Sequence, residues 1–181
     1  MTDLRKLMDL CPPPDRDAAP VRAVGDGSAR GAVGLPAEHQ EMIAVYGVGC
    51  FDEFLWVYGE AVGNRHLCIE HRTETIRSVL LAHARPRLNA FLSEFGARTE
   101  ELIQWGGTDN GDSLLWVPVG PPNGWPTLIL EVRQRDMEVV RQSSVGIILG
   151  LLTGTLQSSI FPDDFPSSRP AFMPSFRATH D

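Results

Sequence analysis

The chain has 181 residues, a length that suits one folded domain and is short for two. Hydrophobic residues make up 43% of it and charged residues 22%, which excludes a wholly disordered or collagen-like chain. The net charge of -7 arises mainly from two segments, since residues 35–70 hold six acidic residues and one basic one, and residues 99–131 hold five acidic residues and no basic one. A nucleic-acid binder needs a basic stripe on its working face, so we expect no nucleic-acid partner.

Targeting and redox signals are sparse. The longest strongly apolar run, residues 145–156, is too short to span a bilayer. The first ten residues include Asp3 and Asp9 and lack the apolar core of a signal peptide. The three cysteines make a poor disulfide framework. We therefore expect a cytoplasmic protein with free thiols and no membrane contact.

The first 34 residues form a separate segment. Residues 2–11 predict a short helix, with Thr2 as its N-cap and the run Pro12–Pro14 as its end. Residues 15–34 contain Ala, Gly, Asp and Arg with little apolar content, so we expect a mobile linker there. The boundary of the main domain is accordingly placed after residues 1–34.

A helix and a strand open the main domain. Pro36 suits the first turn of a helix, which Gly47 ends. Residues 51–58 predict one strand, with one face formed by Phe51, Leu55 and Val57 and the other by Phe54, Trp56 and Tyr58.

The middle of the chain predicts a short strand and two helices. Residues 67–69 read as the strand, and Thr73 caps a helix through about Ala84. A second helical piece follows Pro86 and ends at Gly96.

Three strands follow, at residues 101–105, 113–117 and 127–133. The sequence Asp109-Asn110-Gly111-Asp112 between the first two is a strong hairpin-turn signal, because Asn and Gly tolerate positive φ. These strands predict an antiparallel meander.

The last helix begins at a cap formed by Ser143 or Ser144 and runs to about Leu156. Residues beyond it are rich in Pro, Ser and Phe, and residues 166–181 are interpreted as an extended tail. The elements together predict an α+β fold, in which an antiparallel sheet of about four to six strands packs with helices from both ends of the chain.

Motifs for catalysis or metal binding are weak. His66-x-Cys68-x-x-His71 offers three zinc ligands in six residues, but no fourth ligand is evident and the paired spacing of structural zinc sites is missing. No nucleophile elbow or phosphate-binding loop occurs. We expect no catalytic, cofactor or metal site; a small hydrolase or metal enzyme that uses these three residues is the least favoured alternative.

The order of Gly, Trp and Leu-Pro residues along residues 35–165 is more informative. Its first part is Leu35-Pro36, Tyr46-Gly47-x-Gly49-x-Phe51 and Phe54-Leu55-Trp56-Val57-Tyr58. Its second part is Leu102-Ile103-Gln104-Trp105-Gly106, Thr108-Asp109-x-Gly111-Asp112, Leu115-Trp116 and Trp125-Pro126, and Leu151-Leu152-x-Gly154 closes it. In order and spacing these pieces resemble the SUKH superfamily, the Smi/Knr-type proteins, and so predict a SUKH-like domain over residues 35–165.

This resemblance implies an α+β domain without catalysis. Many bacterial members are similar to immunity proteins, which bind and neutralise polymorphic or contact-dependent toxins, often nucleases or deaminases. The expected partner is therefore a protein, most simply a toxin domain of that type. The alternative is an intracellular regulatory or interaction module of the same fold with a non-toxin partner.

The acidic segments suggest how such a partner would be bound. A toxin that handles nucleic acid has a basic cleft, and an acidic inhibitor surface is steered toward it. An aromatic anchor would add contact area, since one or two of the four Trp residues are expected at a contact surface and the rest in the core. The predicted partner-binding residues are Asp52, Glu53, Tyr58, Glu60, Trp105, Asp109 and Asp112.

Overall fold

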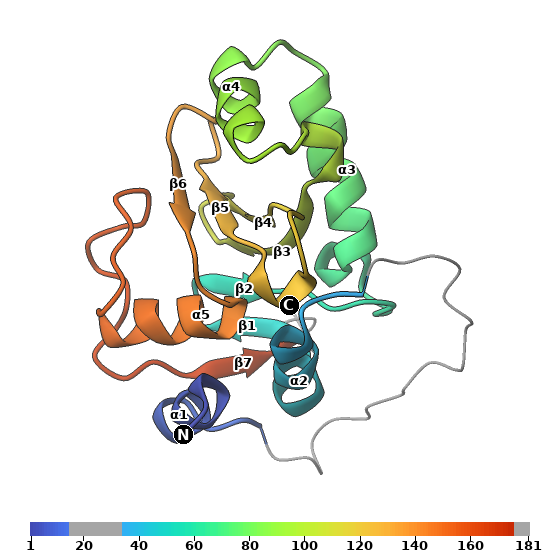
Figure 1. The fold of residues 1–181 in the computed structure, drawn as a ribbon. Helices are drawn as coiled ribbons and strands as arrows, with labels where there is room; N and C mark the ends of the chain where they lie inside the picture. Colours follow the sequence, from blue (N-terminus) through green and yellow to red (C-terminus); the bar gives the residue numbers. More distant parts are fainter. Residues whose placement is uncertain (15–33, 176–181) are drawn as a thin grey trace.

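A computed structural model describes residues 1–14 and 34–175 (Figure 1). The predicted linker at residues 15–34 falls, except for Gly34, outside the described residues. The helices are α1 (Asp3–Leu10), α2 (Ala37–Tyr46), α3 (Ile69–Leu81), α4 (Pro86–Glu94) and α5 (Ser144–Thr153). The strands are β1 (Gly49–Phe51), β2 (Leu55–Val57), β3 (Ile103–Thr108), β4 (Ser113–Trp116), β5 (Thr127–Leu130), β6 (Met137–Val140) and β7 (Phe172–Pro174). Short 3₁₀ helices lie at Arg65–Leu67, Thr99–Glu101 and Pro122–Gly124.

The strands form one antiparallel sheet in the order β6-β5-β4-β3-β2-β1-β7. The predicted α+β class is confirmed, but the sheet has seven strands rather than four to six. The two strands that the sequence analysis missed, β6 and β7, are the two edges. Part of the expected tail, residues 166–181, therefore belongs to the sheet.

The predicted strand over residues 51–58 is a hairpin of two strands. Asp52 and Glu53 take left-handed conformations, with φ of 54° and 55°, and so reverse the chain between β1 and β2. The predicted strand at residues 67–69 is wrong as well: its residues end a 3₁₀ helix and begin α3, and only a bridge between Gly59 and Cys68 remains.

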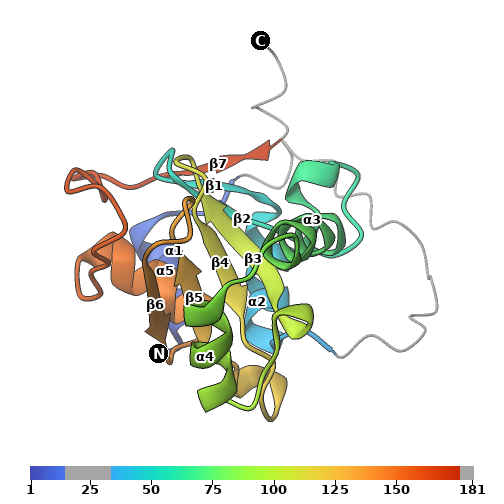
Figure 2. The ribbon, with the colours of Figure 1, turned by 90° about the horizontal axis from the view of Figure 1, so that it is seen from above.

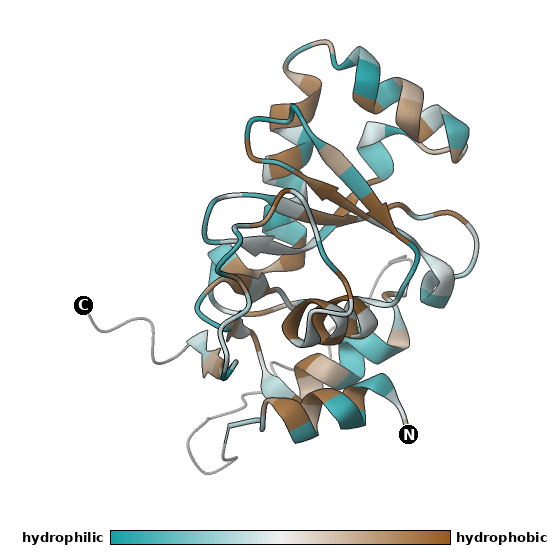
Figure 3. Ribbon diagram, turned by 90° about the vertical axis from the view of Figure 1, so that its left-hand side faces the viewer, coloured by the Kyte–Doolittle hydropathy of each residue, from teal (hydrophilic) through white to brown (hydrophobic). Residues whose placement is uncertain are grey.

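Helices cover both faces of the sheet. One apolar cluster joins α1, α2 and α5 to the first face, with Trp105, Leu114 and Ile129 pointing into it from neighbouring strands. A second cluster joins α3 and α4 to the opposite face, where Leu115 and Leu128 point. Figure 2 shows α3 and α4 on one side of the sheet and α1 and α5 on the other. In the hydropathy colours of Figure 3, brown residues gather in the central strands and in α5, which matches a core on both faces.

Local signals set both ends of α5: its start is the predicted one, but it ends at Thr153, before the predicted end at about Leu156. The Ser143 hydroxyl accepts a hydrogen bond from the Gly146 N–H at 3.0 Å, and this bond caps the helix. Gly154 ends it with φ of 71°, a left-handed conformation that glycine adopts without strain. The cap places the start of α5 against α2, where the Ser144 hydroxyl lies 3.0 Å from Nδ1 of His39.

Candidate functional site

Three of the predicted carboxylates lie together where two hairpin turns meet. Asp52 and Glu53 form the β1–β2 turn, and Asp109 begins the β3–β4 turn. The Asp109 N–H donates to the Phe54 carbonyl oxygen at 2.9 Å, and this bond joins the two turns. Burial raises the pKa of the nearby Cys50 thiol to about 12, and the charges of Asp109, Glu53 and Asp52 contribute to the rise.

Two further carboxylates join this group from a distant part of the chain. Phe161 and Phe165 pack on Phe54, with ring centroids 5.5 and 4.6 Å away. Asp163 and Asp164 lie exposed in the loop between them. Neither residue is among the predicted partner-binding residues.

We call this group the acidic end, and its members are Asp52, Glu53, Asp109, Asp163 and Asp164. Asp52 also anchors the chain that leads to β7, because its carboxylate accepts from the Ser167 N–H at 2.6 Å and from the Ser167 hydroxyl at 2.5 Å. The other four are exposed. Their turns are fixed by the sheet and by aromatic packing.

Asp112, predicted to bind a partner, is buried inside its own turn. One carboxylate oxygen accepts from the Thr108 hydroxyl at 2.7 Å, and the other accepts from the Val132 N–H at 2.9 Å. The side chain therefore links the β3–β4 turn to the end of β5, with 3% of its surface exposed. The prediction was wrong because a turn aspartate bonds readily to nearby backbone amides.

Replacing Asp112 with alanine is expected to lower the free energy of unfolding by about 1–3 kcal/mol, because the buried Thr108 hydroxyl and the half-buried Val132 N–H lose their acceptor. Asp109→Ala is the matched control. Its carboxylate is exposed, so the expected change is within about 0.5 kcal/mol. Urea denaturation of both variants measures the difference, and equal losses would contradict the bonded role of Asp112.

Trp105 and Tyr58, the two predicted anchors, are also buried. Trp105 has no exposed surface, and its indole N–H donates to the Thr127 hydroxyl at 3.1 Å. Tyr58 is 4% exposed. Both predictions treated strand alternation as a sign of exposure, but helices cover both faces of the sheet at β3, and Arg72 of α3 lies over the Tyr58 ring.

Glu60 is exposed but lies apart from the acidic end. It follows β2 beyond Val57, whereas Asp109 lies beyond the opposite end of the strand, at Leu55. Its neighbour is Glu70 of α3: burial, and then the charge of Glu70, raise the pKa of the Glu60 carboxyl. The predicted single acidic face therefore does not include Glu60.

Trp56 is the one of the four tryptophans that stays partly exposed. It lies in the middle of β2, on the face opposite Leu55 and Val57, as the predicted alternation requires. Trp56 is not among the predicted partner-binding residues. The available signal was the alternation, which places Trp56 on the face of the strand away from Leu55 and Val57.

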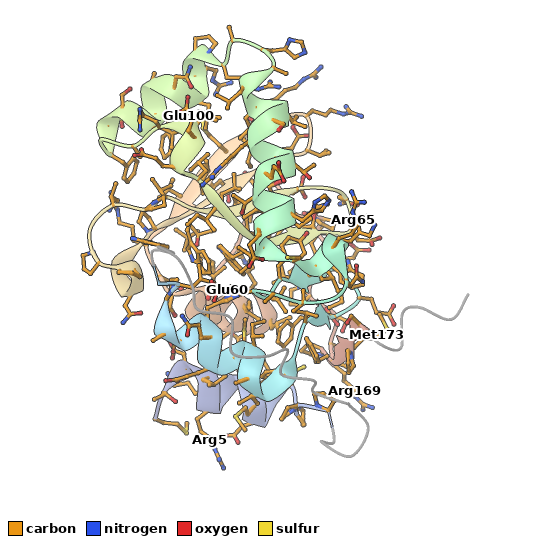
Figure 4. The ribbon with its side chains drawn as sticks, turned by 90° about the vertical axis from the view of Figure 1, so that its right-hand side faces the viewer. Arg5, Glu60, Arg65, Glu100, Arg169 and Met173 are labelled. Carbon is orange, nitrogen blue, oxygen red and sulfur yellow. The ribbon has the colours of Figure 1, made fainter. Side chains whose placement is uncertain are left out.

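A pocket of about 310 Å³ opens beside Trp56. It lies between β2, the 3₁₀ helix Arg65–Leu67, the first turn of α3 and the residue after β7. We call it the Trp56 pocket, and its lining residues are Trp56, Tyr58, Asn64, His66, Leu67, Arg72 and Ser175. Figure 4 faces this side of the molecule, with Arg65 beside the base of α3 and Met173 of β7 below it.

The histidines and cysteine of the weak zinc motif do not converge as ligands. The Cys68 thiol donates to the Glu70 carboxylate at 2.8 Å, and the His71 Nε2 accepts from Arg65. The rings of His66 and His71 lie 6.5 Å apart, centroid to centroid. Among the described residues, no group of three or more His, Cys, Asp or Glu side chains is arranged to hold a metal ion.

Across residues 1–14 and 34–175, every helix falls short of the length and apolar character that a bilayer crossing requires. Comparison of the chain with protein-family models, with curated proteins and with solved structures finds no match in any of the three. The two features on which a function can be argued are therefore the acidic end and the Trp56 pocket, both built on an α+β scaffold.

Proposed function

We propose that the chain is a non-catalytic protein-binding domain of SUKH type that acts in the cytoplasm as an immunity protein. Its partner would be a bacterial toxin domain of nuclease or deaminase type. The observation that carries the proposal is the acidic end, where four exposed carboxylates are held by two joined hairpin turns and an aromatic-packed loop.

The negative charge of the acidic end fits an inhibitor that acts by covering the positively charged cleft of its partner. A protein that acts on nucleic acid presents positive charge at its cleft, and a fixed cluster of carboxylates mimics the charge of the phosphates that it binds. Such a surface raises the association rate at low salt and disfavours acidic partners. The inhibitor needs no reactive group, since it only has to cover the cleft.

The test uses a toxin domain encoded beside this gene, purified and mixed with the full chain. The proposal predicts a complex at micromolar concentration and loss of the toxin's nuclease or deaminase activity. The absence of a complex at that concentration would overturn the proposal. A complex with some other intracellular protein, without a neighbouring toxin gene, would favour the regulatory module instead.

Charge variants locate the binding surface. Glu53→Gln, Asp109→Asn and Asp163→Asn together are expected to slow association at least about tenfold at low salt, with less effect at high salt. The matched control carries Glu60→Gln, Glu74→Gln and Glu94→Gln, which are exposed acidic residues away from the acidic end. Stopped-flow association rates measure both; equal slowing would show that net charge, and not this surface, governs binding.

A further inference from the structure

The Trp56 pocket combines aromatic walls with positive charge. Trp56 and Tyr58 come from β2 and the residue that follows it, and Leu67 closes the apolar part from the 3₁₀ helix. Among the residues that the structure describes, Arg72 and His66 are its only charged or titratable lining residues besides the Tyr58 phenol, and none of its lining residues is a carboxylate. An anion with an apolar body therefore matches the lining better than a cation or a neutral polar group.

Arg72 lies against an aromatic wall of the pocket. Its guanidinium lies over the Tyr58 ring, 5.3 Å from the ring centroid, as in a cation–π pair. Within residues 1–14 and 34–175, it forms no ion pair with a carboxylate. A buried or half-buried arginine that rests on an aromatic ring is well placed to bond a carboxylate with its fork of N–H groups.

Tyr58 is in turn held by the neighbouring strand. A Cβ on Gly107 of β3 would lie 2.6 Å from the Tyr58 hydroxyl oxygen, so the ring occupies space that only glycine leaves free. Gly107 pairs with Trp56 in the sheet register. The Tyr58 wall is therefore held against the backbone of β3, which lowers the entropic cost of binding a flat ligand.

We propose that the Trp56 pocket binds a small aromatic carboxylate, with the ring between the aromatic walls and the carboxylate on Arg72. The volume, about 310 Å³, is at the lower end of the range for small-molecule sites and holds one or two fused rings. The proposal does not depend on the toxin-binding function.

The probe is 2-naphthoate, titrated into the ¹⁵N-labelled full chain and followed by chemical shifts of the backbone and of the Trp56 indole N–H. Saturable binding is expected with a Kd of about 1 mM or tighter, the value that its size allows. The neutral 2-naphthamide and the non-aromatic cyclohexanecarboxylate are each expected to bind at least about tenfold more weakly. Nuclear Overhauser contacts from 2-naphthoate to Trp56 and Leu67 place the ligand without any variant.

Two variants test the assignment. Arg72→Met keeps the apolar stem and removes the charge, and is expected to weaken 2-naphthoate binding at least about tenfold while leaving 2-naphthamide unchanged. Arg98→Met is the matched control, since Arg98 is an exposed arginine outside the pocket lining, and should leave binding unchanged. Equal binding of acid and amide, equal weakening by both variants, ligand contacts away from Trp56, or no saturation at 10 mM would each overturn the proposal.

Discussion

Replacing Trp105 with alanine is expected to lower the free energy of unfolding by about 3–5 kcal/mol, the usual cost of removing a fully buried large aromatic side chain. Trp105 has no exposed surface and stacks on Trp116 with ring centroids 6.0 Å apart. Its loss leaves a cavity between the sheet and the helices of the first face. It also leaves the buried Thr127 hydroxyl without its donor.

Trp56→Ala is the control, because both residues are tryptophans on neighbouring strands of the same sheet. Trp56 is partly exposed, so its loss is expected to cost less than about 2 kcal/mol. Urea denaturation followed by far-ultraviolet circular dichroism measures both variants. If the two losses were equal, the distinction between a core Trp105 and a surface Trp56 would be wrong.

Most helices could be predicted because their signals are local. The predicted Thr73 cap is wrong: α3 begins at Ile69, and the Thr73 hydroxyl lies inside the helix, where it accepts from the Gln104 N–H of β3 at 3.0 Å. Ser143 caps α5 and Gly154 ends it, and both functions depend on residues within one turn of the helix. The α+β class follows from the same reasoning, since the order of helices and strands is read along the chain. The number of strands could not be predicted from the same local signals.

The two edge strands depend on contacts that the local sequence does not contain. β7 pairs with β1, more than 100 residues earlier in the chain, where a Cβ on Gly49 would collide with the Met173 carbonyl oxygen. β6 is four half-buried residues that pair only with β5. A three- or four-residue strand has too little periodicity to be recognised, and here pairing decides its conformation.

The candidate site could be predicted only in part, because it too depends on contacts between segments that are distant in the sequence. Asp52, Glu53 and Asp109 lie together because two hairpin turns are joined at the same end of the strands. The turn signal at Asp109 predicts one of these hairpins, whereas the β1–β2 turn falls within a predicted strand. Exposure of an individual residue was harder to predict. Alternation separates the two faces of a strand, but it says nothing about whether a helix covers each face, which is why Trp105 was mistaken for an anchor.

His39, which is not among the residues selected from the sequence, joins three elements in the core. From α2, its Nε2 contacts the Tyr58 carbonyl oxygen at 2.8 Å, and its Nδ1 contacts the Ser144 hydroxyl at 3.0 Å. A carbonyl can only accept, so Nε2 carries the proton and Nδ1 accepts from Ser144. The ring also lies edge-on to Trp116, with centroids 4.9 Å apart. This arrangement fits a neutral imidazole.

Stability is therefore expected to fall as the pH drops from about 6.5 to about 4. Burial lowers the pKa of His39 to about 4, and the bond to Tyr58 offsets only part of this shift. In the unfolded chain the imidazole takes its proton near pH 6.5, so between these two pH values the unfolded state binds more protons and acid favours unfolding. The loss is complete below about pH 4 and amounts to about 3 kcal/mol.

The His39→Gln variant isolates this contribution from that of the carboxylates. It is expected to be less stable than the wild type at pH 7.5, since its amide cannot reproduce both bonds of the ring, but to lose about 3 kcal/mol less on acidification. His83→Gln, at an exposed histidine, should keep the wild-type pH profile. Urea denaturation at pH 7.5, 6.5, 5.5 and 4.5 measures the three slopes. If wild type and His39→Gln lose stability in parallel over this range, the buried imidazole does not control the acid sensitivity of the fold.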